Sequence, residues 1–154
     1  MLISENEKMK KKTNEIVMDK KLDTVDKILM LIRNSTAQIR KINDKWYHDL
    51  ELHDIDFKKC LAKNSNDSSK RIAQTLIKQG INEHLIENYP AGLIVDSTRI
   101  LIRNLFSHEY ITNSKYSIET IFTFISNLFM SGVLTSKGKM KIKNNKKKSI
   151  DGKI

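Results

Sequence analysis

The stretch Thr24–Trp46, TVDKILMLIRNSTAQIRKINDKW, decides the fold class of this chain. Its apolar residues recur mostly at steps of three and four, the spacing of one apolar face of an α-helix: Val25, Ile28, Leu29, Ile32, Ile39, Ile42 and Trp46. Asp23 stands just before this stretch and Asp26 follows three residues later, in the manner of a capping box. We therefore predict a helix over 24–42 that continues or restarts near Asn43.

The rest of the chain carries the same helical signals. One proline and five glycines interrupt 154 residues, and so few breakers favour long helices over a turn-rich β-fold. Helical patterns extend over 45–61, 70–79, 90–106 and 118–132, with Pro90 in a first turn and Ser117 as a cap. We predict an all-α bundle of about five to six helices.

The net charge of +10 lies mostly at the two ends of the chain. Residues 137–154 hold eight lysines and one aspartate (+7), and residues 1–21 hold six lysines and four acids (+2). The remaining 115 residues are nearly neutral, with 14 basic and 13 acidic side chains. A Lys/Asn-rich end is typical of a solvated, disordered segment. We therefore expect a helical domain over 23–136, a basic disordered tail over 137–154, and a weak helix or a disordered lead over 1–22.

Several classes of function find no support in the residues. Cys60 is the only cysteine, which excludes an internal disulfide or a cysteine-based zinc cluster and fits a reducing cytoplasm. His48 and His53 lie five residues apart, whereas a helical metal pair needs four, so we expect no metal site. No catalytic motif, phosphate-binding loop, secretory signal or membrane-spanning stretch is present, and we expect neither an enzyme nor a cofactor.

The helices over 90–106 and 118–132 are apolar on more than one face. The apolar residues of the first helix are Leu93, Ile94, Val95, Ile100, Leu101, Ile102, Leu105 and Phe106. Those of the second helix are Ile118, Ile121, Phe122, Phe124, Ile125, Leu128, Phe129 and Met130. A helix of this kind lies either in the centre of a large core or in an interface. In so short a chain an interface between two copies is the favoured reading.

Three stretches resemble one protein family. They are Ile42–Leu50 (INDKWYHDL), Arg71–Glu83 (RIAQTLIKQGINE) and Phe129–Gly138 (FMSGVLTSKG). In this order they are similar to the C-terminal ligand-binding and dimerisation domain of TetR/AcrR-type transcriptional regulators, and the resemblance extends from Asp23 to Ile142. His84 stands where the family has a second glycine, and the turn there is therefore expected to differ.

The resemblance implies a role in transcription regulation, in which the family's proteins bind DNA. The family reads DNA through a helix-turn-helix unit of about fifty residues that precedes the ligand domain. Residues 1–22 do not contain its pattern and correspond by register to a remnant of the helix that links the two halves. We therefore expect no DNA-binding residue in this sequence, and DNA contact only through a helix-turn-helix unit that it lacks.

The resemblance implies a small effector inside the bundle and a homodimer. Apolar positions that could face such a ligand are Met30, Trp46, Leu50, Phe57 and Leu76. Arg99 and Arg103 interrupt an apolar helix four residues apart. If either points inward it needs Asp96, Glu119 or an acidic ligand as its partner, and otherwise it extends to the surface or bridges the dimer. The effector is therefore expected to be small and either apolar or acidic.

The two terminal helices are expected to meet their two-fold copies in a four-helix bundle. The residues predicted to be buried in that dimer interface are Ile94, Leu101, Leu105, Ile121, Ile125, Leu128 and Phe129.

Two other functions stay open beside the effector-sensing domain of a repressor. A stand-alone interaction module would use the same dimer face without a small ligand, and it predicts a solidly packed bundle with no cavity. A nucleic-acid-associated protein would use its lysine-rich ends, with binding that falls steeply with salt. The confinement of the charge to the ends weighs against the last of these.

Overall fold

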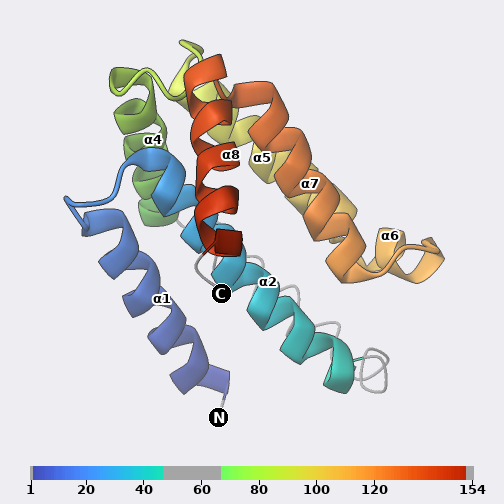
Figure 1. Cartoon of the computed structure of the whole chain (residues 1–154). Helices are drawn as coiled ribbons and strands as arrows, with labels where there is room; N and C mark the ends of the chain where they lie inside the picture. The colour runs from blue at the N-terminus through green and yellow to red at the C-terminus, as the bar shows by residue number, and fades with distance from the viewer. Residues whose placement is uncertain (1, 47–66, 152–154) are drawn as a thin grey trace.

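The structure, a computed structural model, describes residues 2–46 and 67–151 (Figure 1). Within these ranges the helices are α1 (Leu2–Met18), α2 (Thr24–Trp46), α4 (Asp67–Asn82), α5 (Ala91–Leu105), α6 (His108–Asn113), α7 (Ile118–Val133) and α8 (Ser136–Asp151). The same ranges hold no β-strand, only an isolated bridge between Ile86 and Leu134. The predicted all-α class is therefore confirmed. None of the described helices combines the length and the apolar character needed to cross a membrane.

Two predicted helix starts are confirmed by their capping hydrogen bonds. The Asp23 carboxylate accepts a hydrogen bond from the Asp26 backbone N–H (3.0 Å), and the Ser117 hydroxyl accepts one from the Thr120 N–H (3.1 Å). Each bond satisfies a donor in the first turn that has no partner within its helix. Between α5 and Ser117 lies the short helix α6, which Ser107 caps by accepting a hydrogen bond from the Tyr110 N–H (3.2 Å).

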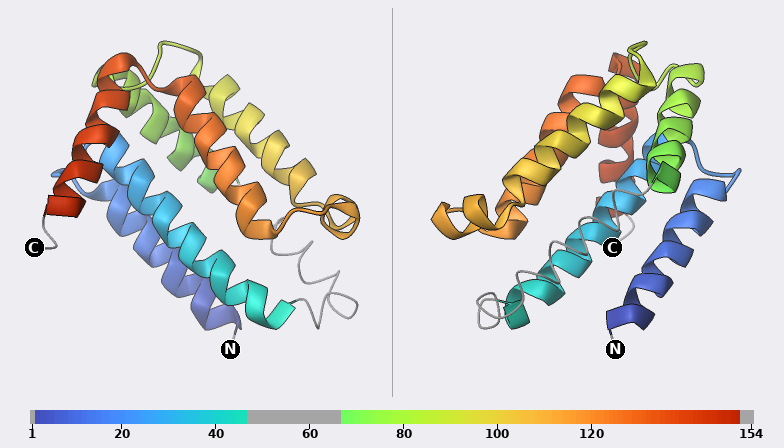
Figure 2. Two further views of the ribbon diagram at one scale, coloured as in Figure 1. Left: turned by 45° about the vertical axis from the view of Figure 1, so that its right-hand side comes forward. Right: turned by 180° about the vertical axis from the view of Figure 1, so that it is seen from behind.

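Helices α5 and α7 lie side by side and run in opposite directions (Figures 1 and 2). Helix α2 packs against α7 and α4, and α1 lies along α2 on the side away from α7. The buried side chains form two apolar clusters. The first, where α4, α5 and α7 meet the start of α2, contains Val25, Ile28, Leu76, Ile77, Leu85, Ile86, Ala91, Ile94, Val95 and Leu134. The second, towards α6, contains Phe106, Ile118, Ile121 and Ile125.

The first cluster is closed by a contact between two turns, residues 80–87 and 133–138, which we call the junction. The Glu87 N–H donates to the Val133 carbonyl (2.8 Å) and the Thr135 N–H to the Leu85 carbonyl (3.1 Å). Ile86 and Leu134, which form the bridge, are almost completely buried. The junction joins the end of α4 to the end of α7, and the Lys137 ammonium also donates to the Glu83 carbonyl across it (3.0 Å).

His84 adopts the left-handed backbone conformation that favours glycine, with φ of 57°. We expected a different turn at this position, and the structure keeps the left-handed turn with a side chain in place of a glycine hydrogen. The turn is held by the junction itself, because the His84 carbonyl accepts a hydrogen bond from the Thr135 hydroxyl (2.9 Å).

Residues 136–151 form helix α8, whereas the sequence predicted a disordered tail over 137–154. The number of charges in this segment does not show that one side of it contacts the rest of the fold. Lys141 forms ion pairs with Asp23 and Asp26, and the Asn145 amide donates to Asp26 (2.8 Å). Lysine is also a good helix former. At the other end of the chain, a helix occupies Leu2–Met18, one of the two alternatives expected for 1–22.

A partly buried network of polar side chains fixes the start of α2 against the end of α4. The Glu83 carboxylate accepts from the Thr24 N–H (2.9 Å) and from the Gln79 side-chain amide (2.6 Å), and Gln79 accepts from the Lys27 ammonium (2.9 Å). Thr24 is fully buried and Lys27 is 4% exposed. Burial tends to raise the pKa of Glu83, but the hydrogen bonds from Thr24 and Gln79 and the charge of Lys27 outweigh it and lower that pKa.

Replacing Gly138 by Ala tests the junction, because a Cβ there would overlap the backbone carbonyl oxygen of Leu85. We expect Gly138→Ala to destabilise the chain by about 1–3 kcal/mol, the cost of overpacking. The matched control is Gly132→Ala in the last turn of α7, where a Cβ meets nothing within 4 Å. Because alanine is the better helix former, this control is expected to be neutral or stabilising by up to about 1 kcal/mol. Urea unfolding measures both, and equal effects would contradict the close contact.

Replacing Glu83 by Gln keeps the shape and one acceptor oxygen but removes the charge near Lys27. Because folding lowers the pKa of Glu83, its ionised form adds stability above the ordinary value of 4.5 and loses it as the pH falls through the folded-state pKa. We expect Glu83→Gln to be less stable than the parent chain at pH 7, by a margin that shrinks as the pH is lowered below 4.5. Urea unfolding across this pH range measures the margin, with the exposed Glu87→Gln as control. A margin independent of pH would contradict this role.

Candidate functional site

An apolar cleft of about 330 Å³ lies between α2, α4, α5 and α7. It is bordered by members of both apolar clusters. Its apolar lining comes from all four helices and consists of Ile28, Leu31, Ile32, Ala73, Leu76, Ile77, Val95, Ile102, Phe122, Ile125 and Phe129. Ligand sites are concave and mostly apolar, with volumes of about 300–1,000 Å³. The cleft has the lining of such a site and a volume at the lower end of that range.

The polar residues of the lining are Ser69, Thr98, Arg99 and Ser126. Arg99 is the one charged residue among the described residues that border the cleft. The Thr98 hydroxyl donates to the Ile94 carbonyl within its own helix (2.8 Å). In the described part of the chain, neither Arg99 nor Ser126 has a hydrogen bond or ion pair from its side chain. A few polar groups in an apolar wall are what orients a ligand.

Two of the seven residues predicted for a ligand pocket border this cleft, namely Leu76 and Arg99. Met30 is 38% exposed and lies outside the lining, and Arg103 is exposed in the last turn of α5. A positive charge near the C-terminal end of a helix is favourable. Leu50 and Phe57, the helix predicted over 45–61, Cys60 and the histidines at 48 and 53 lie outside the described residues, as does the side chain of Trp46.

Most of the cleft lining was not predicted from the sequence, for example Ile28 on α2, Ala73 on α4 and Phe122 on α7. Their periodicity identified an inward face correctly, but it could not distinguish a packed core from a cleft wall. The available signal was the small side chain of Ala73 among larger apolar residues on α4, because a small residue leaves space beside a helix.

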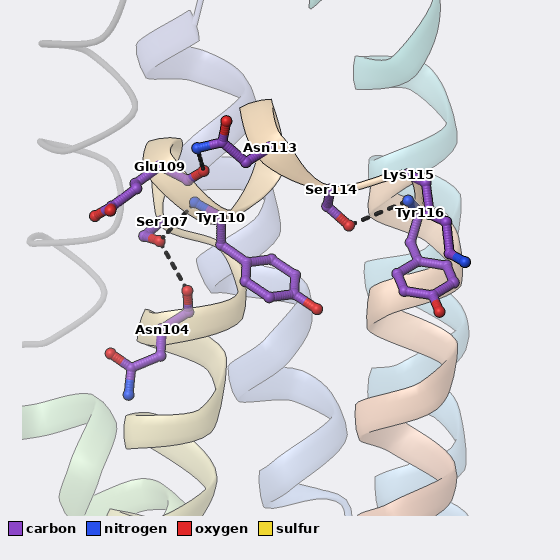
Figure 3. A pocket seen from close by; sticks show the side chains of 8 residues that line it. All are labelled: Asn104, Ser107, Glu109, Tyr110, Asn113, Ser114, Lys115 and Tyr116. Carbon is purple, nitrogen blue, oxygen red and sulfur yellow. Dashed lines mark hydrogen bonds between the residues drawn. The ribbon is translucent and has the colours of Figure 1, made fainter.

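A second hollow, of about 660 Å³, lies at the tip formed by the end of α5, by α6 and by the turn before α7 (Figure 3). Several of its polar groups already form hydrogen bonds within this tip. Ser107 donates to the Asn104 carbonyl (2.8 Å), the Asn113 amide to the Glu109 carbonyl (2.9 Å), and the Tyr116 N–H to the Ser114 hydroxyl (3.1 Å). These hydrogen bonds give the polar residues a structural role, because they cap helices and support turns. We therefore assign no ligand to this hollow.

The outward faces of α5 and α7 expose large apolar side chains, which we call the outer face. These are Leu93 (61% exposed), Ile100 (57%), Phe124 (58%) and Leu128 (50%). Of the seven residues predicted for a dimer interface, Leu128 belongs to this face. Leu101, Leu105 and Phe129 are half-buried against the apolar clusters.

Ile94, Ile121 and Ile125, also predicted for the dimer interface, are buried within the single chain. Their side chains have almost no exposed surface that a partner could contact, so we assign them to the core and not to an interface. These three side chains face the interior of the chain rather than its exposed surface.

No protein-family model, curated protein or solved structure matches this chain. The arrangement of the cleft and the outer face therefore carries the functional argument.

Replacing Ala73 by Leu tests whether the cleft is open space. Ala73 borders the cleft and is half-buried, so the added carbons can fill space that is already there. We expect Ala73→Leu to leave stability unchanged or raise it by up to about 2 kcal/mol, from the burial of added apolar carbons. The matched variant is Ala91→Leu, in the packed first cluster, which should cost about 1–3 kcal/mol. Thermal unfolding measures both, and a comparable loss in the two variants would show that the cleft is filled.

Proposed function

We propose that this chain is the effector-sensing and dimerisation domain of a TetR-type transcriptional regulator. The observation that carries the proposal is that α5 and α7 serve two surfaces at once. Their inner sides border the apolar cleft through Val95, Ile102, Phe122 and Ile125. Their outer sides expose the four apolar side chains of the outer face. A ligand in the cleft would therefore act directly on the helices that meet a second copy.

The mechanism is a shift between two arrangements of the dimer. A ligand changes such an equilibrium only by binding one arrangement more tightly than the other. The cleft has walls on α2 and α4 as well as on α5 and α7, so its width depends on how these two pairs sit relative to one another. An occupant that fixes this width would select one arrangement. We assign no DNA contact to this domain, and we propose that it acts in the cytoplasm.

The stand-alone interaction module is the second candidate, and it predicts a bundle without a cavity. The cleft of about 330 Å³ favours the effector-sensing domain over it. The outer face suits both candidates, because each needs a second copy. Exposed apolar side chains on two neighbouring helices are a mark of interaction sites.

Replacing Phe124 by Lys tests dimerisation. We expect the parent chain to form a dimer of about 36 kDa, twice the 17.9 kDa of one chain. Burying a Phe side chain contributes about 1.5–3 kcal/mol to the free energy of association, and a two-fold dimer buries one Phe124 side chain from each chain. Phe124→Lys should therefore raise the dimer dissociation constant by at least about a hundredfold. Sedimentation equilibrium measures this.

The control for Phe124→Lys is Met140→Lys. Met140 is 63% exposed, but it lies on α8 and outside the outer face. This control should leave the dissociation constant unchanged. A parent chain that stays at 17.9 kDa at every concentration would contradict the proposal.

A further inference from the structure

We propose that the cleft binds a small amphipathic carboxylate, with its carboxylate on Arg99 and its apolar body against the walls of α2, α4 and α7. This inference rests on the proposed function and names the chemical class of its effector. Three observations carry it, namely the apolar walls, the volume of the cleft and the unpaired charge of Arg99.

The walls determine the body of the ligand. All four helices present aliphatic or aromatic side chains to the cleft, and three of the four polar residues of its lining come from α5 and α7. A ligand with polar groups along its length would lose hydrogen bonds to water without replacement on the walls of α2 and α4. The body is therefore a hydrocarbon chain or ring.

The volume determines the size of the ligand. The cleft holds about 330 Å³. At roughly 30 Å³ for each non-hydrogen atom, the share of a water molecule in the liquid, this corresponds to about eleven such atoms. A medium-chain fatty acid or a substituted aromatic acid has this size, whereas a long-chain lipid or a nucleotide is too large.

Arg99 determines the charged end. Asp96 and Glu119, the two carboxylates that the sequence offered as partners for Arg99, pair with other residues. Asp96 pairs with Lys70 (2.7 Å), and Glu119 pairs with Arg40 (2.8 Å). Arg99 has no ion-pair partner in the described part of the chain, yet it is half-buried and borders an apolar space. An apolar guest beside it would remove water from a guanidinium that has no counter-charge, which is costly. A carboxylate avoids this cost, since it can accept two parallel N–H bonds from a guanidinium.

Ser126 is a second polar residue of the same lining. Helices α5 and α7 lie side by side and run in opposite directions (Figure 1). Arg99 borders the cleft from α5 and Ser126 borders it from the neighbouring α7. The Ser126 hydroxyl is not committed to another described residue. It can donate to the second oxygen of a carboxylate that Arg99 holds.

The test measures the binding of three probes to the full chain by isothermal titration calorimetry at pH 7. Octanoate carries the proposed charge, octan-1-ol has the same tail without charge, and octylammonium has the opposite charge. The variants are Arg99→Gln and its matched control Arg103→Gln, which removes an exposed arginine four residues along the same helix. Thermal unfolding verifies that both variants are folded.

We expect octanoate to bind more tightly than octan-1-ol, and octylammonium to bind most weakly. Arg99→Gln should weaken octanoate about 10- to 100-fold, the effect of losing a charge-assisted hydrogen bond, and should leave octan-1-ol unchanged. Arg103→Gln should change neither.

Other results would overturn the inference in distinguishable ways. If octanoate and octan-1-ol bind equally well and Arg99→Gln changes neither affinity, the proposed contact between Arg99 and a carboxylate is wrong. The proposal of an effector-sensing domain is not contradicted by that result. Equal losses in the two arginine variants would show general attraction by a positive surface rather than a contact in the cleft. If none of the three probes binds, both the ligand class and the effector-sensing function fail, although dimerisation can still be observed.

Discussion

The bundle depends on the close contact of two turns at the junction, 80–87 and 133–138. Hydrogen bonds between their backbones set the direction in which the chain leaves α4 and α7, and therefore the directions of α5 and α8. Neither Gly80 nor Gly138 has room for a Cβ, because Ile86 and Thr24 press against the first and the Leu85 carbonyl against the second. The carboxylate of Glu83 then caps the start of α2 from the same turn. One small region thus orients five of the described helices.

Much of the helical structure could be predicted because its signals are local. Asp23 and Ser117 cap helices within three residues of their own positions, and apolar spacing identified the inward faces. Helix α8 was missed because its support is not local. Lys141 and Asn145 find their partners in α2, more than a hundred residues earlier in the chain. A composition argument treats such lysines as solvated, since sequence spacing contains no information about a distant acid.

The site was predictable only in part, and for a related reason. Leu76 and Arg99, which border the cleft, were named from the sequence because one is apolar at a helical step and the other interrupts an apolar helix. Whether an apolar residue packs into a core, borders a cleft or stays exposed depends on how four helices are spaced, which periodicity does not determine. Ile121 and Phe124 illustrate the limit. They stand three residues apart in one apolar helix, yet one is buried and the other largely exposed.

The division of the interior into two apolar clusters has a consequence for how the chain unfolds. Two separate cores often melt separately, each as its own cooperative unit. Here α2, α5 and α7 each place side chains in both clusters, as Ile28 and Ile39 do for α2. A helix forms cooperatively along its length, so melting one half of these three helices weakens the other half. The described bundle should therefore lose its structure in a single transition, with the three shared helices acting as the link between its cores.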